Sequence, residues 1–463
     1  MDRNLGIGLY VMKNIDLHAE PAPRTTQKQR WLYAATSLGV RLPGQVIAVS
    51  LLYFYTDIKR LPPVWASTAL AIYAIYNALN NPILGYLQDR KFIGGLRRIP
   101  WIKFGALPAM VFFAALWMPP FDGTTHPQML VVYMFIVLVL FDAFATAVSN
   151  AYHALLPEMF VNFRERTGVA ARMNIFYTVA LLLSVALPLP ISKIIGWGPM
   201  GILFGLIGLG AIFFGIRGMF ENNTAAEPNI SFLQALRATI LNRSFTSLTL
   251  AQAMRFVATQ TQAAGTIFFV KYTLGFKDSD STLVLATVFI VSAAMIYPWR
   301  QLIANRREPR TTALLAYVAT TIGAASLWFV NSLAGMYVAA VLIGTGFAGI
   351  FLMDNILLSE VMDEDEMRSG QRREAMYFGM NSMAAPLGMA LVSICFGIIT
   401  SAYGYNPVLS TQPETVRLGF RIFMTAVPVA SCLAAFTLLL AFYPLHGARL
   451  RELKRTLAQH RNI

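Results

Sequence analysis

Long apolar segments recur along the whole chain, separated by short polar connections. An α-helix rises 1.5 Å per residue, so about 20 mostly apolar residues cross the roughly 30 Å of hydrocarbon in a bilayer. The segments that meet this condition are 33–55, 65–87, 101–119, 129–152, 173–193, 199–219, 247–270, 281–299, 312–331, 334–358, 376–402 and 418–443. The pattern therefore predicts an all-α membrane protein with twelve transmembrane helices.

The longest central connection divides these helices into two sets of six. The predicted parts are a tail at 1–32, a six-helix bundle at 33–219, a loop at 220–246, a second bundle at 247–443 and a tail at 444–463. Two six-helix halves joined by a loop are the major facilitator layout, in which the substrate binds near the bilayer midplane between the halves.

Basic residues gather on alternate connections. One set comprises Lys28, Arg30, Arg97, Arg98, Arg300, Arg306, Arg449 and Arg451, whereas the opposite connections carry little beyond Lys59, Arg60 and Lys277. Cytoplasmic loops are enriched in Lys and Arg, so this asymmetry predicts that the loop and both tails are cytoplasmic. We expect a multi-pass protein of the cell (inner) membrane with no cleavable signal peptide.

Composition agrees with the membrane assignment. Hydrophobic residues make up 56% of the 463 positions and charged residues 13%, against roughly 25% charged in soluble domains. The net charge of +14 is explained by topology, so no nucleic-acid partner is expected. There is no cluster of metal ligands, phosphate-binding loop or catalytic triad spacing, which argues against an enzyme, a metal site, a cofactor or ATP-driven transport. The expected state is a monomer in lipid.

Four charged residues stand out at membrane depth within the apolar segments: Arg41, Asp142, Arg255 and Asp354. Each costs at least about 2.5–3.5 kcal/mol at the bilayer centre, so each needs a partner or water. Contact with a substrate and a structural ion pair are both open for Arg41. Asp142 is a candidate proton carrier, substrate acceptor or partner of Arg41. Gln262 shares a polar helix face with Arg255, while His153 fits a solvated helix end.

Several motifs follow one another in a recognisable order. They are Y-F-Y-T-D at 53–57, N-A-L-N-N-P-I-L-G at 77–85, R-I-P-W-I at 98–102, Y-H-A-L-L-P-E at 152–158 and G-Q-R-R-E at 370–374. This set resembles the glycoside–pentoside–hexuronide:cation symporters, the melibiose permease-like branch of the major facilitator superfamily. The resemblance runs from helix one to helix eleven and implies secondary transport of a sugar or glycoside.

The cation site of that family is altered in this chain. The two helix-two aspartates that hold sodium or a proton in the family correspond to Asn77 and Asn81, on either side of Asn80, and a nearby lysine corresponds to Pro386. An amide supplies a dipole where a carboxylate supplies a full charge, and it takes up no proton at physiological pH. The resemblance therefore implies a degenerate cation site, and it stays open whether protons or no ion are coupled to transport.

The sugar site departs as well. The helix-one aspartate of the family corresponds to Arg41 and the helix-four acid to Ser149, while the helix-five arginine is kept as Arg172. The predicted substrate-binding residues are thus Arg41, Asp142, Ser149, Arg172, Arg255, Gln262 and Asp354. A gate between the halves is predicted from Arg97, Arg98, Asp363, Arg372 and Arg373.

These patterns predict a secondary active or facilitative transporter that moves a small polar solute, a sugar, glycoside or sugar acid, by alternating access. Three arginines, Arg41, Arg172 and Arg255, favour an acidic solute. Two alternatives stay open. One is a lysolipid or amphiphile transporter of the same fold, and the other is a membrane sensor or scaffold that transports nothing.

Overall fold

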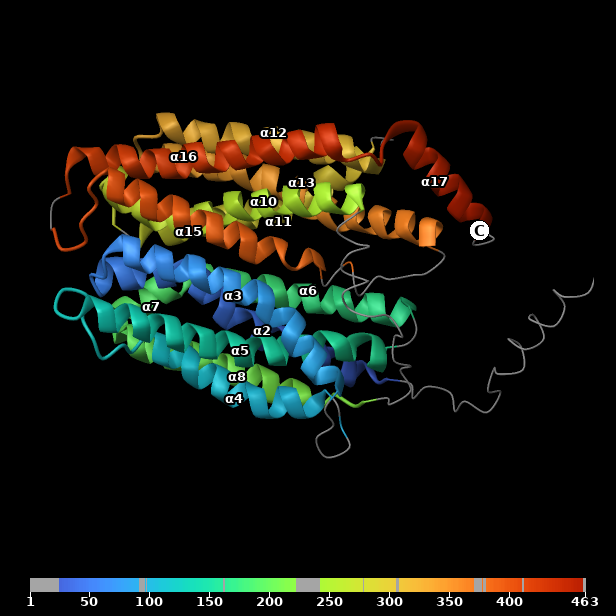
Figure 1. The fold of residues 1–463 in the computed structure, drawn as a ribbon, viewed down its shortest axis with the longest axis horizontal. Helices are drawn as coiled ribbons and strands as arrows, with labels where there is room; N and C mark the ends of the chain where they lie inside the picture. Colours follow the sequence, from blue (N-terminus) through green and yellow to red (C-terminus); the bar gives the residue numbers. More distant parts are fainter. Residues whose placement is uncertain are drawn as a thin grey trace, which may run out of the picture.

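The helices lie side by side along the longest axis of the molecule, in two bundles stacked one above the other (Figure 1). The computed structural model describes residues 25–90, 96, 98–160, 163–221, 242–277, 279–304, 308–369, 377, 380–409 and 412–460. The start of α2 and the C-terminal helix α17 (Gly447–His460) lie at the same end, here named the tail end. The opposite end is named the Asp57 end.

The first bundle contains six spans. Its helices are α2 (Gln27–Tyr53), α3 (Pro63–Arg90), α4 (Ile99–Leu116), α5 (Pro127–Met159), α6 (Phe163–Ala186) continued by α7 (Pro188–Ile195), and α8 (Trp197–Ile216). Within it, α2 packs against α6 and α8, and α5 packs against α3 and α4.

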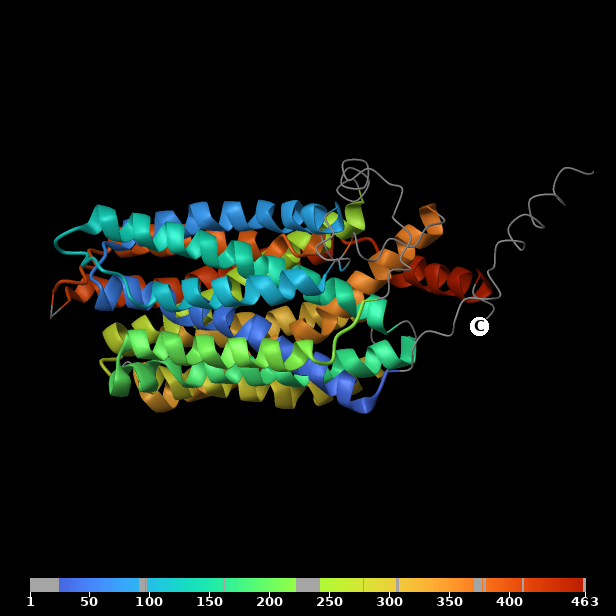
Figure 2. The ribbon, with the colours of Figure 1, turned by 90° about the horizontal axis from the view of Figure 1, so that it is seen from below.

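The second bundle also contains six spans. Its helices are α10 (Arg243–Phe268), α11 (Asp280–Ala304), α12 (Pro309–Ser326), α13 (Leu333–Ser369), α15 (Ala384–Ala402) and α16 (Glu414–Thr437), with short turns η3 (Leu327–Phe329) and η4 (Leu438–Phe442). The halves meet where α2 contacts α10, α3 contacts α15 and α6 contacts α11. Figure 2 shows the same bundles turned by 90°.

Within the described residues, twelve helical spans confirm the predicted fold class. Ten of them are long and apolar enough to cross a membrane by length and composition alone. The other two, α3 and α10, fall short because they carry polar residues such as Asn77, Asn80, Gln252 and Arg255. These polar helices are among those that contact the opposite half, which places the chain's intramembrane polarity near the boundary between the halves.

Two prolines act differently from one another. The predicted fifth span, 173–193, is divided between α6 and α7 at Leu187, because Pro188 has no N–H to continue the helical hydrogen bonds. Pro43, by contrast, lies inside the continuous helix α2.

The first and seventh spans end alike. α2 continues into the π-helical turn η1 (Phe54–Ile58), and α10 continues into η2 (Phe269–Thr273). In η1 the carbonyl of Phe54 accepts from Lys59 N at 2.9 Å, and in η2 that of Phe269 accepts from Leu274 N at 3.1 Å. The corresponding first helices of the two halves thus end in the same kind of turn, as does α16 in η4.

Candidate substrate site

Arg41 lies in α2 and is half-buried. Its guanidinium carbon stands 4.3 Å from the centre of the Tyr177 ring, so the cation rests on an aromatic face. Its buried Nε makes no hydrogen bond. The side chains of His153 and Tyr152 in α5 lie within the electrostatic reach of its positive charge. No Asp or Glu of the described part of the chain forms an ion pair with it. The arrangement leaves donor capacity free for an anion.

His153 lies beside this arginine, more than a turn before the end of α5. Its Nδ1 is 2.7 Å from the carbonyl oxygen of Ser149, and because a carbonyl oxygen only accepts, Nδ1 carries the hydrogen. The other ring nitrogen, Nε2, is then an acceptor in the neutral ring. The side chain is exposed rather than packed, so Nε2 is available to a donor such as a hydroxyl group of a solute.

Asp142 has a different set of partners from the one considered in the sequence. It is 6% exposed, and its carboxylate accepts from Tyr73 Oη at 2.9 Å, Asn77 Nδ2 at 3.1 Å and Asn80 Nδ2 at 2.9 Å. Tyr73 Oη itself accepts from Asn77 at 3.0 Å. The hypothesis of an Arg41–Asp142 pair is therefore wrong for this structure. Residues predicted as two separate groups, Asp142 and the helix-two amides, form one network.

Arg255 of α10 is paired. Its Nε stands 2.6 Å from Asp354 Oδ2 of α13, and its guanidinium carbon is 4.0 Å from the centre of the Phe256 ring. Gln262, two turns along α10, is buried, and its Nε2 is 3.4 Å from the carbonyl oxygen of Met424. Here the charge is already compensated, which favours a structural ion pair over an open anion site.

The remaining predicted residues are spread out. Arg172 lies toward the tail end, where it donates to Gln27 at 3.0 Å and stacks on Trp31, and so stands apart from Arg41. Arg98 pairs with Glu158 of its own half at 3.6 Å. Asp363 lies in α13, whereas the side chain of Asn81 and residues Arg97, Arg372 and Arg373 are outside the described residues. The predicted gate stays a prediction.

A contact between the halves that the sequence analysis missed lies at the Asp57 end. The buried carboxylate of Asp57 pairs with Lys271 and accepts hydrogen bonds from Tyr272 at 2.6 Å and from Tyr405. Nearby, a Cβ added to Gly397 of α15 would meet Ser67 Oγ of α3 at 2.2 Å, so only glycine allows this approach. These contacts join the two halves at the Asp57 end. The signal in the sequence was a lysine and two tyrosines near the ends of helices seven and eleven.

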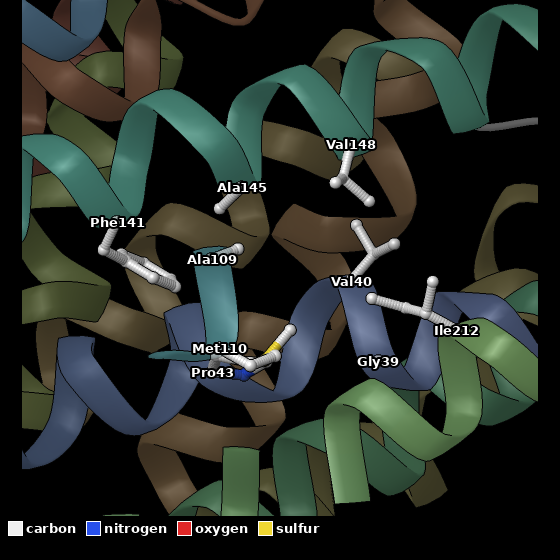
Figure 3. A pocket seen from close by; sticks show the side chains of 9 residues that line it. All are labelled: Gly39, Val40, Pro43, Ala109, Met110, Phe141, Ala145, Val148 and Ile212. Carbon is white, nitrogen blue, oxygen red and sulfur yellow. The ribbon is translucent and has the colours of Figure 1, made fainter. Parts of the chain in front are cut away.

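A small pocket lies elsewhere, within the first half (Figure 3). It holds about 10 Å³, room for one water molecule, and its lining includes Val40, Ala109, Phe141 and Val148. All the side chains that line it are apolar, and it contains none of the charged groups described above. It is a packing defect between α2, α4, α5 and α8. Among the described residues, no group of three or more His, Cys, Asp or Glu is placed to hold a metal.

Comparison with known proteins agrees with this architecture. The putative glycoside/cation symporter YagG of Escherichia coli (strain K12) is 23% identical, over 94% of this chain and 96% of its own length. The sodium-dependent lysophosphatidylcholine symporter 1-A of Danio rerio is 22% identical, over 92% and 88%. A bacterial homologue of the human lysosomal transporter Spinster, solved inward-facing and unoccupied, aligns with a TM-score of 0.69 at 13% identity, over 90% of this chain and 98% of its own.

The family described as MFS/sugar transport protein matches residues 32–447, nearly the whole of both bundles. Its relatives named above are symporters, which pair a solute with a cation, and this agrees with the resemblance found in the motifs. The twelve spans, the two repeated halves and the polar groups near their boundary are the features that such proteins need. This chain belongs to the MFS/sugar transport family and is a multi-pass membrane transporter, not an enzyme.

Proposed function

We propose that this protein moves a small acidic polar solute, of the sugar-acid class, across the membrane by alternating access, and that Arg41 binds its anionic group. One observation carries the proposal: among the described residues no carboxylate pairs with Arg41, whereas Arg255 has Asp354. A half-buried guanidinium at membrane depth is costly without an anion, so a solute carboxylate is a fitting partner. His153 Nε2 and Ser149 offer neighbouring positions for hydroxyl groups.

The closed Asp57 end supports alternating access. Asp57, Lys271 and Tyr405 join the halves on that side, so a solute would exchange at the tail end. We propose that both tails and the loop at 220–246 are cytoplasmic, which makes this an inward-facing state of a monomer in the inner membrane. Single cysteines at Lys28 and Arg451 should react with a reagent only from the cytoplasm, and one at Thr124 only from outside.

Counterflow in liposomes tests the function directly. Purified protein is reconstituted with unlabelled glucuronate inside, and entry of radiolabelled glucuronate is followed; glucose serves as the neutral matched sugar. We expect glucuronate to exchange and glucose to exchange far less. Exchange of glucose alone would remove the acidic solute, and absence of any exchange would favour the sensor or scaffold alternative.

One relative supports a second candidate function. The symporter of Danio rerio is named for lysophosphatidylcholine, whose phosphate could also bind Arg41. Labelled lysophosphatidylcholine is therefore the third arm of the same experiment. Its movement between leaflets, without glucuronate counterflow, would replace the sugar-acid proposal by an amphiphile transporter.

A further inference from the structure

Asp142 is a buried carboxylate that no cation compensates. Asp354 has Arg255 and Asp57 has Lys271, but no Lys, Arg or His among the described residues acts on Asp142. The titratable groups that face it are Tyr73 and Tyr76, both from α3; α2 and α4 bring no charged group to it. Neutral side chains stabilise the anion, Tyr73, Asn77 and Asn80 by hydrogen bonds and Thr146 beside them, but none of them carries a positive charge. An isolated charge inside a membrane marks a functional site by default.

The amide side chains around Asp142 can form hydrogen bonds with both its ionised and its protonated form. Asn77 and Asn80 lie on one face of α3, because residues three or four apart are neighbours on a helix. In the present state both nitrogens donate to Asp142. An amide that rotates by half a turn presents its oxygen instead, and this oxygen can accept from a carboxylic acid. The same side chains can therefore satisfy the carboxylate and its protonated form.

We infer that Asp142 is the site of the coupling proton, and that the charge which the family places on helix two is supplied here from helix four. This rests on the proposed function. Binding is a single step: a proton adds to one carboxylate oxygen of Asp142, the negative charge is lost, and the new O–H donates to the amide oxygen of Asn77 or Asn80. Release reverses it.

The position of Asp142 explains how the proton and the solute could be coupled. Asp142, Ser149 and His153 follow one another along one side of α5, two turns and then one turn apart. Asp142 and Ser149 are about 10 Å apart along the axis. One helix thus joins the carboxylate to the surroundings of Arg41. When both the proton and an anionic solute are bound, neither buried charge is left uncompensated, and the loaded protein meets the smallest cost in changing state.

Infrared difference spectroscopy tests proton binding without a solute. Full-length protein in liposomes is titrated over roughly pH 4 to 9, the range that carboxyl groups span in proteins. We expect a protonated-carboxyl band that is present in the wild type and in Asp122→Asn, a loop control, and absent from Asp142→Asn. In Tyr73→Phe the band should move to higher frequency, because the group loses a hydrogen bond. A band that is unchanged in Asp142→Asn and Tyr73→Phe overturns the inference.

A transport arm then tests coupling with glucuronate as the probe. A pH gradient should drive accumulation by the wild type and by the Asp122→Asn control, and Asp142→Asn should lose this pH-driven accumulation at least tenfold. Replacing choline with sodium should change nothing. Accumulation driven by sodium alone, or undiminished pH-driven accumulation by Asp142→Asn, refutes the proton site. If the wild type shows no glucuronate counterflow, the proposed function fails, while the infrared result still decides the fate of Asp142.

Discussion

Arg41 and Arg255 stand at similar depths in the first helix of each half, yet their surroundings differ. Both rest on aromatic rings, Tyr177 at 4.3 Å and Phe256 at 4.0 Å. Within the part of the chain that the structure describes, Arg255 also meets a carboxylate, Asp354, at 2.6 Å, and Arg41 does not. The repeated fold thus supplies the same scaffold twice, and one acidic side chain decides what each arginine can do.

The different surroundings of the two arginines assign Arg255 to stability and Arg41 to substrate binding. An arginine that is already paired holds α10 to α13, and a solute anion would have to displace Asp354 to reach it. Arg41 has no such competitor, so its fork of donors is pre-organised for a planar anion. Replacement of Arg41 should therefore affect transport, whereas replacement of Arg255 should affect folding.

The largest effect on transport is expected at Arg41. Arg41→Ala should lower glucuronate counterflow by roughly 10- to 150-fold, since a hydrogen bond to a charged group contributes about 1.5–3 kcal/mol. Arg41→Lys should restore little, because an ammonium cannot reproduce bidentate geometry. Thermal stability should stay near that of the wild type, as no protein anion loses a partner. Near-normal counterflow by Arg41→Ala would remove this residue from the site.

The paired arginine gives the next effect, on stability. Arg255→Gln leaves Asp354 buried without a cation, which should cost about 3–5 kcal/mol and lower the melting temperature in detergent. The double variant Arg255→Gln/Asp354→Asn should regain most of that stability, because both charges are gone. If the double variant is no more stable than the single one, the pair is not the structural element that we describe.

The fold was predictable because the bilayer thickness sets the length of the apolar segments, and the membrane sides set the distribution of basic residues between the loops. The twelve spans follow from counting apolar residues, and even the polar helices α3 and α10 stay recognisable. Residue roles were harder. Asp142 and Asn77 are far apart in the chain, and only the packing of α5 on α3 brings them to 3.1 Å. The pairing of Arg41 with Asp142 was wrong because helix neighbours do not specify which side chains face each other.

The contact at the Asp57 end had no counterpart in the sequence analysis for a similar reason. Asp57, Lys271 and Tyr405 come from three helix ends in two halves, and each alone fits an ordinary position near the membrane surface. We expect their meeting to depend on the state of the transporter, since it joins the two halves. One sequence encodes every conformational state of the transporter. A contact that forms in only one state therefore produces no periodic pattern in the sequence.

This contact predicts a shift in conformation. Lys271→Met leaves Asp57 without its cation, which should weaken closure and raise the population open at the Asp57 end by about tenfold, for a loss of about 1.4 kcal/mol. A cysteine at the buried Ser67 should then react faster with a reagent added from that side. Exchanging the charges in Asp57→Lys/Lys271→Asp should slow labelling again. Equal labelling rates in all three proteins would show that the ion pair does not hold the halves closed.

The smallest effect is expected at Ser149, which stands where the symporter family has an acid. Its hydroxyl is 3.4 Å from His153 Nδ1, a weak contact, whereas its backbone carbonyl holds the same nitrogen at 2.7 Å. Ser149→Ala keeps that carbonyl, so the ring keeps its tautomer and direction. Counterflow of glucuronate should fall by no more than about twofold, which corresponds to less than about 0.5 kcal/mol.

Ser149→Asp is the matched contrast, because it restores a carboxylate close to His153 and Arg41. The new carboxylate should form an ion pair with Arg41, as Asp354 does with Arg255. Counterflow should therefore drop well below that of Ser149→Ala. Equal activity in the two variants would mean that Arg41 is not the group that recognises the solute's charge.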